Sequence, residues 1–303
     1  MSFNQTLSAV LRGHWLLDKA WAESHIPLVL SMLKGNPVSF VERTGNEETE
    51  QPFAIHPDTM VRYDLYRYDY NAGRYVPNPN IPAGSIGFLP VTGPITKYNG
   101  TCGEPGAILH ATRLADLGKR ENISAIIILM DTPGGEARAA HSFVTAIESV
   151  NKPVLAYVDD MAASLGMWIT AACDEVYVSS KVARVGSIGS YLTLADWSGY
   201  FEQQGIKLHE IYAPQSEDKN KDYKEALKGN YEMIQAELKI HVDHFISHIE
   251  TSRPQAAAHT KEWGTGKMFF PGDSQRIGLI DGVKTLQQVV SKAAWLGKRN
   301  KNL

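Results

Sequence analysis

The sequence predicts an α/β fold, because strand-like and helix-like patterns alternate along most of the chain. The clearest strand is 125–131, AIIILMD, which is apolar at nearly every position, and a helical pattern follows it at 136–151. A continuous apolar run is typical of a strand that is buried on both faces of a parallel sheet. Its alternation with helices favours βαβ units around such a sheet.

The other elements follow from the same two patterns. We expect further strands at short apolar or alternating runs, at 84–95, 153–160, 175–179 and 208–212. We expect helices where apolar residues recur every three or four positions, at 111–123, 163–174 and 222–253, the last of them broken at Gly229.

The first 80 residues differ in character from the rest. Residues 5–35 have a helical pattern that Pro27 must kink or divide, and 36–80 are rich in Asn, Pro, Gly and charged residues. We interpret the second stretch as a loop-rich connector with a helix or short strands of its own. The sequence thus predicts an N-terminal extension over 1–80 and a main domain over 81–303.

Composition argues against several classes of protein. The 303 residues are 43% hydrophobic and 21% charged, which is enough for a sizeable core. A formal net charge of −3 does not suggest a nucleic-acid or membrane-surface binder, so we expect neither partner. No signal peptide and no long apolar run is visible, so we expect a soluble, cytoplasmic protein. The two cysteines, Cys102 and Cys173, are interpreted as free thiols.

The first candidate site is 131–135, DTPGG, which follows the apolar strand directly. Proline fixes φ, and the two glycines reach backbone conformations that other residues avoid. Such a turn before a helix can direct backbone N–H groups at an oxyanion, near the positive end of the helix dipole. A structural strand-to-helix turn explains the same residues, and this segment alone favours that interpretation.

The second candidate site is Ser164, in the segment 160–168 after the next strand. The small residues Ala162 and Ala163 allow a close backbone approach, and the serine falls at the first turn of a predicted helix. There the N–H of Leu165 can help to bind an oxyanion while Ser164 attacks. Serine is also a common N-cap residue, and this segment alone favours both roles equally.

A third segment, 185–190 or VGSIGS, has two glycines three positions apart and indicates a tight loop near a strand end. It lacks the spacing of a phosphate-binding loop. Together, DTPGG, AASLGMW and VGSIG in this order and spacing resemble the signal peptide peptidase A family of serine peptidases, peptidase family S49. The resemblance covers residues 84–285 and includes the late segment 278–283, GLIDGV.

The resemblance implies a Clp/crotonase-like ββα spiral core, so that 81–303 is the peptidase domain and Ser164 is the nucleophile. Backbone N–H groups of the two glycines or of the residue after the serine would bind the oxyanion, and the GSIG segment would line the substrate groove. Members often have a glycine directly after the serine, where this chain has a leucine that would reshape the pocket. The implied oxyanion and substrate-binding residues are Gly134, Gly135, Leu165, Ser187, Ile188 and Gly189.

A serine nucleophile needs a base, and no histidine is an obvious choice. Three histidines share one face of the long predicted helix, where a solvated or packed surface fits better than a metal site, because no acidic or cysteine cluster completes it. We therefore expect no metal and no cofactor. The histidines weighed as a base are His110, His141, His209, His241, His244 and His248.

The family uses a lysine as the base, and a lysine serves only if its pKa is lowered from its usual value. The resemblance places this lysine after the strand at 208–212 and before the long helix. There Lys219 matches best, Lys221 second and Lys224 third. Acidic neighbours would raise the pKa of any lysine that they approached, and a solvated charged loop explains each lysine singly.

The implied mechanism is peptide hydrolysis by a Ser-Lys dyad. Neutral Lys219 takes the proton of Ser164, the serine attacks a peptide carbonyl, and lysine-activated water releases the acyl-enzyme. The substrate is expected to add as a strand along 135–137 and 187–189. Family members form rings, so the resemblance also implies a homo-oligomer with active sites near subunit interfaces, where the lysine can serve a neighbour.

The lack of a recognisable membrane anchor favours the phage and prophage branch of the family, which processes capsid or scaffold proteins during head maturation. A signal-peptide or general peptide-degrading peptidase of the same family is the alternative. Two other classes stay open. A crotonase-like acyl-CoA enzyme would use an acid such as Glu136 and need no serine, and a non-catalytic assembly protein would keep the fold alone.

Overall fold

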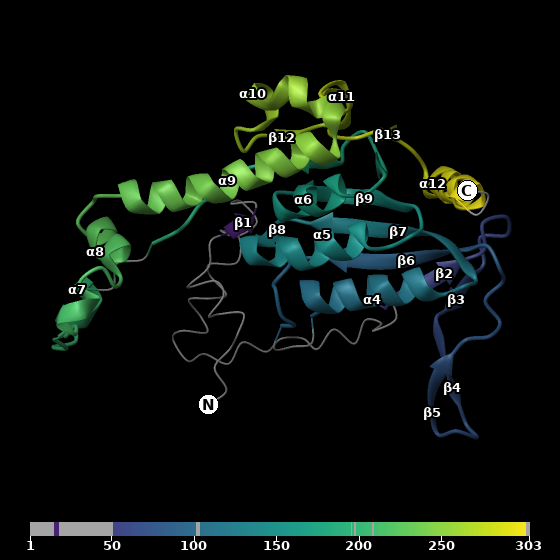
Figure 1. Cartoon of the computed structure of the whole chain (residues 1–303), viewed down its shortest axis with the longest axis horizontal. Helices are drawn as coiled ribbons and strands as arrows, with labels where there is room; N and C mark the ends of the chain where they lie inside the picture. The colour runs from purple at the N-terminus through teal and green to yellow at the C-terminus, as the bar shows by residue number, and fades with distance from the viewer. Residues whose placement is uncertain are drawn as a thin grey trace.

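The centre of the fold is a mixed sheet with nine strands in the described part of the chain (Figure 1). Its order is β12-β11-β9-β7-β6-β2-β3, and β10 joins it beside β9 and brings in β13. The structure is a computed structural model that describes 15–17 (backbone only), 51–100, 104–194, 196, 198–207 and 209–300.

The elements have the following bounds. The strands are β1 (Trp15–Leu17), β2 (Phe53–Ile55), β3 (Arg62–Asp64), β4 (Tyr66–Asp69), β5 (Arg74–Pro77), β6 (Ser85–Thr92), β7 (Ile123–Thr132), β8 (Gly134–Glu136), β9 (Val154–Ala163), β10 (Glu175–Val178), β11 (Arg184–Gly186), β12 (Met268–Phe269) and β13 (Gly282–Val283). The helices are α4 (Ala107–Lys119), α5 (Ala140–Glu148), α6 (Leu165–Ala171), α7 (Ser198–Gln203), α8 (Lys221–Leu227), α9 (Glu232–Ser252), α10 (Thr260–Trp263), α11 (Pro271–Arg276) and α12 (Leu286–Asn300), with short 3₁₀ turns at Ala137–Ala139, Pro214–Ser216 and Pro254–His259.

Strand β7 is buried on both faces, as its apolar sequence predicts. Ile126 and Ile128 belong to the larger apolar cluster, which α4, α5 and α6 complete on one face of the sheet. Ala125 and Ile127 belong to a second cluster, which α12 covers on the opposite face (Figure 1). The alternation of side chains along a strand therefore divides one apolar run between two cores.

The strands that carry the candidate motifs are parallel. β6 pairs with β7, β7 with β9, and β9 with β11, each in parallel register. Parallel neighbours end at the same edge of a sheet, so the segments that follow these four strands gather there. Those segments hold Ile95, β8, Ser164 and Ser187.

The α/β prediction is confirmed, and four of the predicted strands appear as β6, β7, β9 and β10. The helix predicted over 5–35 is wrong at Trp15–Leu17, which form β1 and pair antiparallel with β8. The rest of that stretch lies outside the described residues. Pairing with another strand has overridden the local helical periodicity here, as tertiary contacts commonly do.

The strand predicted over 208–212 is wrong at 209–212, which have no regular secondary structure; residue 208 lies outside the described part. This stretch belongs to an arm, formed by α7, α8 and the first part of α9, that extends away from the sheet, whereas the last part of α9 packs on α6 (Figure 1). The alternating pattern there has no neighbouring strand to pair with among the described elements. The long helix predicted over 222–253 is confirmed as α8 and α9, broken at 228–231.

The predicted extension over 1–80 contributes to the central sheet. β2 pairs antiparallel with β6 and with β3. The short strands expected in this stretch are present, and β4 and β5 form a separate hairpin with exposed tyrosines. The boundary between residues 80 and 81 stays a prediction. None of the helices in the described part of the chain is long and apolar enough to cross a membrane.

An ion pair with a buried arginine joins the end of α9 to the segment before β13. Arg253 is only 2% exposed, and its guanidinium donates to the Gly278 carbonyl at 3.0 Å and to the Asp281 carboxylate at 2.9 Å. Asp281 also accepts the Val176 N–H at 2.6 Å, so the pair anchors α9 to β10.

We expect Arg253→Met to lower the free energy of unfolding by about 2–3 kcal/mol, because it leaves the buried Gly278 carbonyl without its donor and removes the partner of the partly exposed Asp281 carboxylate. Urea denaturation measures this loss. The matched control is Arg276→Met, which removes an exposed pair with Glu262 and is expected to cost under about 1 kcal/mol. Equal losses in the two variants would contradict the structural role of Arg253.

Candidate active site

Ser164 connects β9 to α6 and has an unusual backbone conformation. Its φ is +52° and its ψ is −113°, although it is not a glycine. Its N–H donates to the Gly186 carbonyl at 2.7 Å, and its own carbonyl accepts the Trp168 N–H at 3.1 Å. A non-glycine residue in such a conformation costs roughly 1–3 kcal/mol of folding free energy. The interactions of the flanking strand β9 and helix α6 offset this cost.

The Ser164 hydroxyl does not cap α6. The residue occupies the N-cap position, but its side chain makes no capping hydrogen bond, and the hydroxyl has no partner among the described residues. The side chain is 1% exposed, so it sits in an enclosed position at the end of β9. The N-cap role that the sequence left open is therefore not the one that the structure shows.

The two glycines of DTPGG lie in a short strand and not in a turn that leads directly into a helix. Gly134 and Gly135 begin β8, and α5 begins only at Ala140. The predicted contribution of a helix dipole at these glycines is therefore wrong, because four residues separate Gly135 from the first turn of α5. The glycine at 135 is required by close packing, since a Cβ there would lie 1.9 Å from the Ile95 carbonyl oxygen.

The hydrogen bonds of β8 distinguish the two glycine N–H groups. Gly134 donates its N–H to the Thr132 hydroxyl at 3.1 Å. The carbonyl of Gly134 and the N–H of Glu136 both bond to Ile95, at 2.8 and 2.9 Å. A strand alternates the direction of its polar groups, so the N–H of Gly135 faces the opposite edge, where Leu16 of β1 lies in register.

Helix α6 packs directly on this glycine strand. A Cβ at Gly166 would lie 2.4 Å from the Thr132 methyl carbon, so only glycine allows the contact. The side chain of Leu165 is fully buried in the larger core, and it does not project into the site as the sequence suggested. The N–H of Leu165 is in the first turn of α6, where helical N–H groups have no partner within the helix.

The GSIG segment follows β11 beside Ser164. Ser187 has a φ of +55°, and its N–H donates to the Lys267 carbonyl at 2.8 Å. Ile188 is fully buried, and its carbonyl accepts the Gly266 N–H at 3.0 Å. The side chain of Ile188 thus belongs to the core, and only backbone groups of 187–189 remain for binding an extended peptide.

The candidate lysines lie in the arm. Lys219 is exposed and follows the 3₁₀ turn Pro214–Ser216, and α8, which begins two residues later, lies apart from α6 (Figure 1). Lys221 forms an ion pair with Asp218 at 2.9 Å, and the hydrogen bond to this carboxylate raises the pKa of Lys221. Lys224 lies over the Tyr212 ring at 3.5 Å. Within a single chain, the structure does not bring these lysines to Ser164.

The histidines occupy other parts of the molecule. His110 is buried in α4, where burial and the charge of Arg113 lower its pKa to about 4. The His248 ring makes a 3.0 Å contact with the Trp168 carbonyl, one turn along α6 from Ser164, and burial lowers its pKa. His141, His209 and His244 are exposed, and His241 is half-buried.

The structure also places Glu136 and Cys173, which the sequence analysis considered. The Glu136 carboxylate is buried and accepts the Lys97 N–H at 2.7 Å. The Cys173 thiol is buried in the core, and burial raises its pKa well above the usual range for a thiol. A thiol of this kind is not a nucleophile. Cys102 lies outside the described residues.

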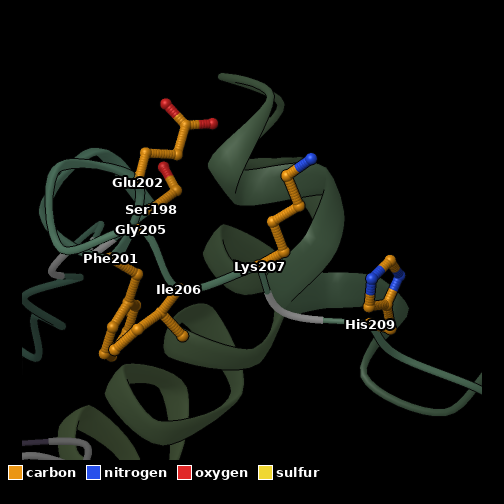
Figure 2. A pocket seen from close by; sticks show the side chains of 7 residues that line it. All are labelled: Ser198, Phe201, Glu202, Gly205, Ile206, Lys207 and His209. Carbon is orange, nitrogen blue, oxygen red and sulfur yellow. The ribbon is translucent and has the colours of Figure 1, made fainter.

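An open pocket is found in the arm. It is formed by α7 and the loop that follows, with the Phe201 and Ile206 side chains side by side and Lys207 and His209 along one side (Figure 2). Neither Ser164 nor the candidate lysines line it, whereas His209, one of the histidines weighed as a base, does. The candidate active site is identified by backbone geometry at the strand ends.

Ser164, at a positive φ, and the adjacent glycine strand β8 thus lie at the carboxyl edge of a mostly parallel sheet in an α/β fold. The sequence model described as Peptidase family S49 matches residues 146–299, just over half of the chain. The chain therefore belongs to peptidase family S49. The resemblance to the signal peptide peptidase A family is confirmed.

Individual relatives are distant. A candidate protease of Methanocaldococcus jannaschii is 26% identical over 181 residues, which cover 59% of this chain and 58% of that protein. The head-tail preconnector protein GP5 of Enterobacteria phage P21 is 26% identical, over 52% of this chain and 34% of its own length. A solved structure of the membrane-bound stomatin-specific protease 1510-N aligns with a TM-score of 0.45 and 20% identity, over 68% of this chain and 82% of the other. The chain thus spans 58% or less of these two relatives.

Proposed function

We propose that the protein is an endopeptidase in which Ser164 attacks the peptide carbonyl. The observation that carries this proposal is the conformation of Ser164, at a φ of +52° with a hydroxyl that caps no helix. A nucleophile held on a sharp strand-to-helix turn is presented for attack, and strained residues of this kind cluster at active sites. The backbone of Ser164 is therefore strained at a residue whose hydroxyl makes no hydrogen bond to the described residues.

A serine-reactive probe tests this proposal. The full-length protein, concentrated enough to assemble, is incubated with a fluorophosphonate, and peptide mass spectrometry locates the adduct. We expect one modified residue, Ser164. Heat-unfolded protein is the control and should not react, because acylation of serine needs the folded site. An absence of any adduct on Ser164 in the assembled sample would overturn the proposal.

The oxyanion is bound, in this proposal, by the N–H groups of Gly135 and Leu165. The N–H of Gly134 already donates to Thr132, which leaves Gly135 as the glycine whose N–H faces the edge of β8 where β1 pairs. Leu165 supplies an N–H without a helical partner directly after the nucleophile. Two backbone donors of this kind stabilise a tetrahedral intermediate strongly, because they need no reorganisation as charge develops.

The substrate adds as an extended strand to the edge of β8 that β1 occupies in this structure, and it displaces β1. The support is β1, a segment of the same chain that pairs antiparallel with β8 and places Leu16 opposite Gly135. Main-chain bonding of this type supplies affinity without requiring one peptide sequence. When the paired carbonyl is the scissile one, the N–H of Gly135 becomes the oxyanion donor. In this proposal β1 occupies the position of the substrate strand.

Weakening β1 is therefore expected to improve peptide binding. Leu16→Pro removes the N–H that pairs with Gly135, because proline has no backbone donor, whereas Leu16→Ala keeps it and is the matched control. We expect the Kd of an unreactive peptide, measured by fluorescence anisotropy, to fall about threefold or more in the proline variant alone, as the fraction of open sites rises. Unchanged affinity would show that β1 does not compete.

The base, in this proposal, is Lys219 of a neighbouring subunit in a homo-oligomeric ring, with Lys221 as the alternative. The support is the arm, which extends the lysine segment away from Ser164 of its own chain (Figure 1). The arm also exposes large apolar side chains that a neighbour would cover, among them Ile211, Tyr231 and Ile240. Approach to a neighbour's site would move Lys219 out of water and favour its neutral form.

We propose the maturation of phage or prophage heads as the biological setting, with a capsid or scaffold protein as the substrate. The support is the 26% identity with the phage protein GP5 over about half of this chain. Degradation of signal peptides or other peptides is the alternative within the family. Incubation with purified phage capsid and scaffold proteins, and separately with signal peptides, followed by mass spectrometry of the fragments, separates the two settings: defined cleavage sites in a head protein favour head maturation.

A further inference from the structure

Thr132 makes contacts with both halves of the proposed site. It is the last residue of β7 and is 1% exposed. Its hydroxyl donates to the Gly93 carbonyl at 2.6 Å and accepts the Gly134 N–H at 3.1 Å. Its methyl group packs against Gly166, where a Cβ would lie only 2.4 Å away. One side chain therefore touches the loop after β6, the glycine strand β8 and helix α6.

We propose that Thr132 is a positioning residue that aims the N–H of Gly135 at the substrate carbonyl. The inference rests on the proposed roles of Ser164 and Gly135. Glycine at 134 has a φ of +110°, so the backbone at this point has little stiffness of its own. The Gly135 N–H shares its peptide plane with the Gly134 carbonyl, which accepts the Ile95 N–H at 2.8 Å and also lies 3.3 Å from the Thr132 hydroxyl. The Thr132 hydroxyl therefore contacts Gly134 at both its N–H and its carbonyl, on either side of this flexible position.

The second part of the proposed role is that Thr132 sets the distance between β8 and α6. The Thr132 methyl fills the space that Gly166 leaves open, so it sets how closely the first turn of α6 approaches β8. The register between β7 and β9 also shifts between Met130 and Thr132, and Thr132 lies opposite Ala162, two residues before Ser164. Such irregularities re-aim side chains at the edges of active sites.

The geometry assigns different tasks to the two substituents of Thr132. The hydroxyl orients the donor on β8, and the methyl spaces the nucleophile on α6. Transition-state stabilisation depends on donor direction, whereas binding of the extended peptide depends mainly on the edge of β8 as a whole. Loss of the hydroxyl is therefore expected to lower kcat while KM changes little.

Thr132→Val and Thr132→Ser separate these tasks in the full-length protein. Valine keeps the methyl and loses the hydroxyl, and we expect kcat to fall about 10- to 100-fold with KM within about threefold, since small misplacements of catalytic groups cost up to that much. Serine keeps the hydroxyl, and we expect kcat within about fivefold of the parent. The matched control is Thr170→Val. Thr170 is also fully buried, but it lies in α6 and its hydroxyl donates to the Met167 carbonyl, so we expect the kcat of this variant to equal that of the parent.

A second measurement excludes a purely structural effect of the valine. In a Ser164→Ala background, an unreactive peptide should bind equally well with threonine or valine at 132. In the Ser164 protein, a peptide aldehyde, which forms a tetrahedral adduct, should bind about 10-fold or more weaker to the valine variant, because only the adduct uses the oxyanion donors. Thermal unfolding checks that both variants are folded at the assay temperature.

The outcomes distinguish this inference from the proposed function. Equal kcat in the parent and the valine variant would overturn the positioning role, and so would a serine variant as impaired as the valine one. If the parent protein itself shows no hydrolysis that depends on Ser164, the proposed function fails, and that result appears before any change at Thr132. A loss of peptide binding in step with kcat would assign Thr132 to general packing and overturn the inference as well.

Discussion

Replacing Ser164 with alanine is expected to lower kcat/KM for peptide hydrolysis by about 1,000-fold or more, because the nucleophile is lost while binding remains. The small side chain of alanine fits the same enclosed position, so the fold should persist. The assay measures initial rates with a fluorogenic peptide and unfolding by calorimetry. We expect the unfolding temperature of Ser164→Ala to equal or exceed that of the parent.

The control for this prediction is Ser274→Ala. Ser274 is also fully buried, and its hydroxyl bonds to the Phe270 carbonyl at 3.1 Å, but it lies in α11 outside the site. We expect a lower stability and an unchanged kcat. Full activity in Ser164→Ala would contradict the peptidase proposal and favour the crotonase-like alternative, in which an acid such as Glu136 transfers protons and no serine is needed.

Replacing Lys219 is the second change with a large expected effect. We expect Lys219→Met to lower kcat about 100- to 10,000-fold, the contribution of a general base, with a small change in KM. Methionine keeps most of the side-chain volume and removes the amine. The control is Lys228→Met, which removes an exposed ion pair with Glu225 at 2.8 Å and should leave kcat unchanged. A loss of activity only in Lys221→Met would transfer the role of base to Lys221.

Mixing the two inactive variants tests whether the lysine acts between subunits. Ser164→Ala subunits retain the lysine, and Lys219→Met subunits retain the serine. If each site combines two neighbours, co-assembled rings regain about a quarter of the parental activity at an equal ratio, because both functional residues then meet at some interfaces. A mixture as inactive as its components, in rings shown by native mass spectrometry to be mixed, would contradict the exchange between subunits.

The local sequence predicted most of the sheet correctly. The apolar run of β7 specifies a strand buried on both faces, since no polar residue remains to face water. The break between α8 and α9 follows from Gly229, which has a φ of +88°. Such signals are local, and the residues that carry them are contiguous in the chain.

Two segments could not be predicted from local patterns. Trp15–Leu17 lie in a segment with a helical periodicity. They nevertheless form a strand, because they pair with the edge of β8, which is more than 100 residues away in the sequence. Residues 209–212 have a strand-like alternation, but the arm offers them no strand to pair with. In both places the decisive contact is between segments far apart in sequence, and periodicity contains no information about it.

The candidate site divides in the same way. The family follows from residue types and their order along the chain, namely a serine after one strand and two glycines after another. The sequence could not decide which of the two glycine N–H groups faces the edge of β8 where a strand can pair. That depends on the tertiary structure, in which the Gly134 N–H donates to the Thr132 hydroxyl. It also suggested that Leu165 would reshape the pocket, whereas the packing of α6 turns this side chain into the core.

The sequence by itself thus determined the α/β class, the peptidase family and the position of Ser164, because each depends on the kinds of residue at fixed local spacing. Only the tertiary structure decided that Ser164 is held at a positive φ with a hydroxyl that has no partner among the described residues, that the N–H of Gly135 faces the edge of β8 where β1 pairs, and that the lysines lie apart from the serine of their own chain. Hydrogen-bond direction and the distance between elements arise from packing of the whole chain, and no local pattern specifies them.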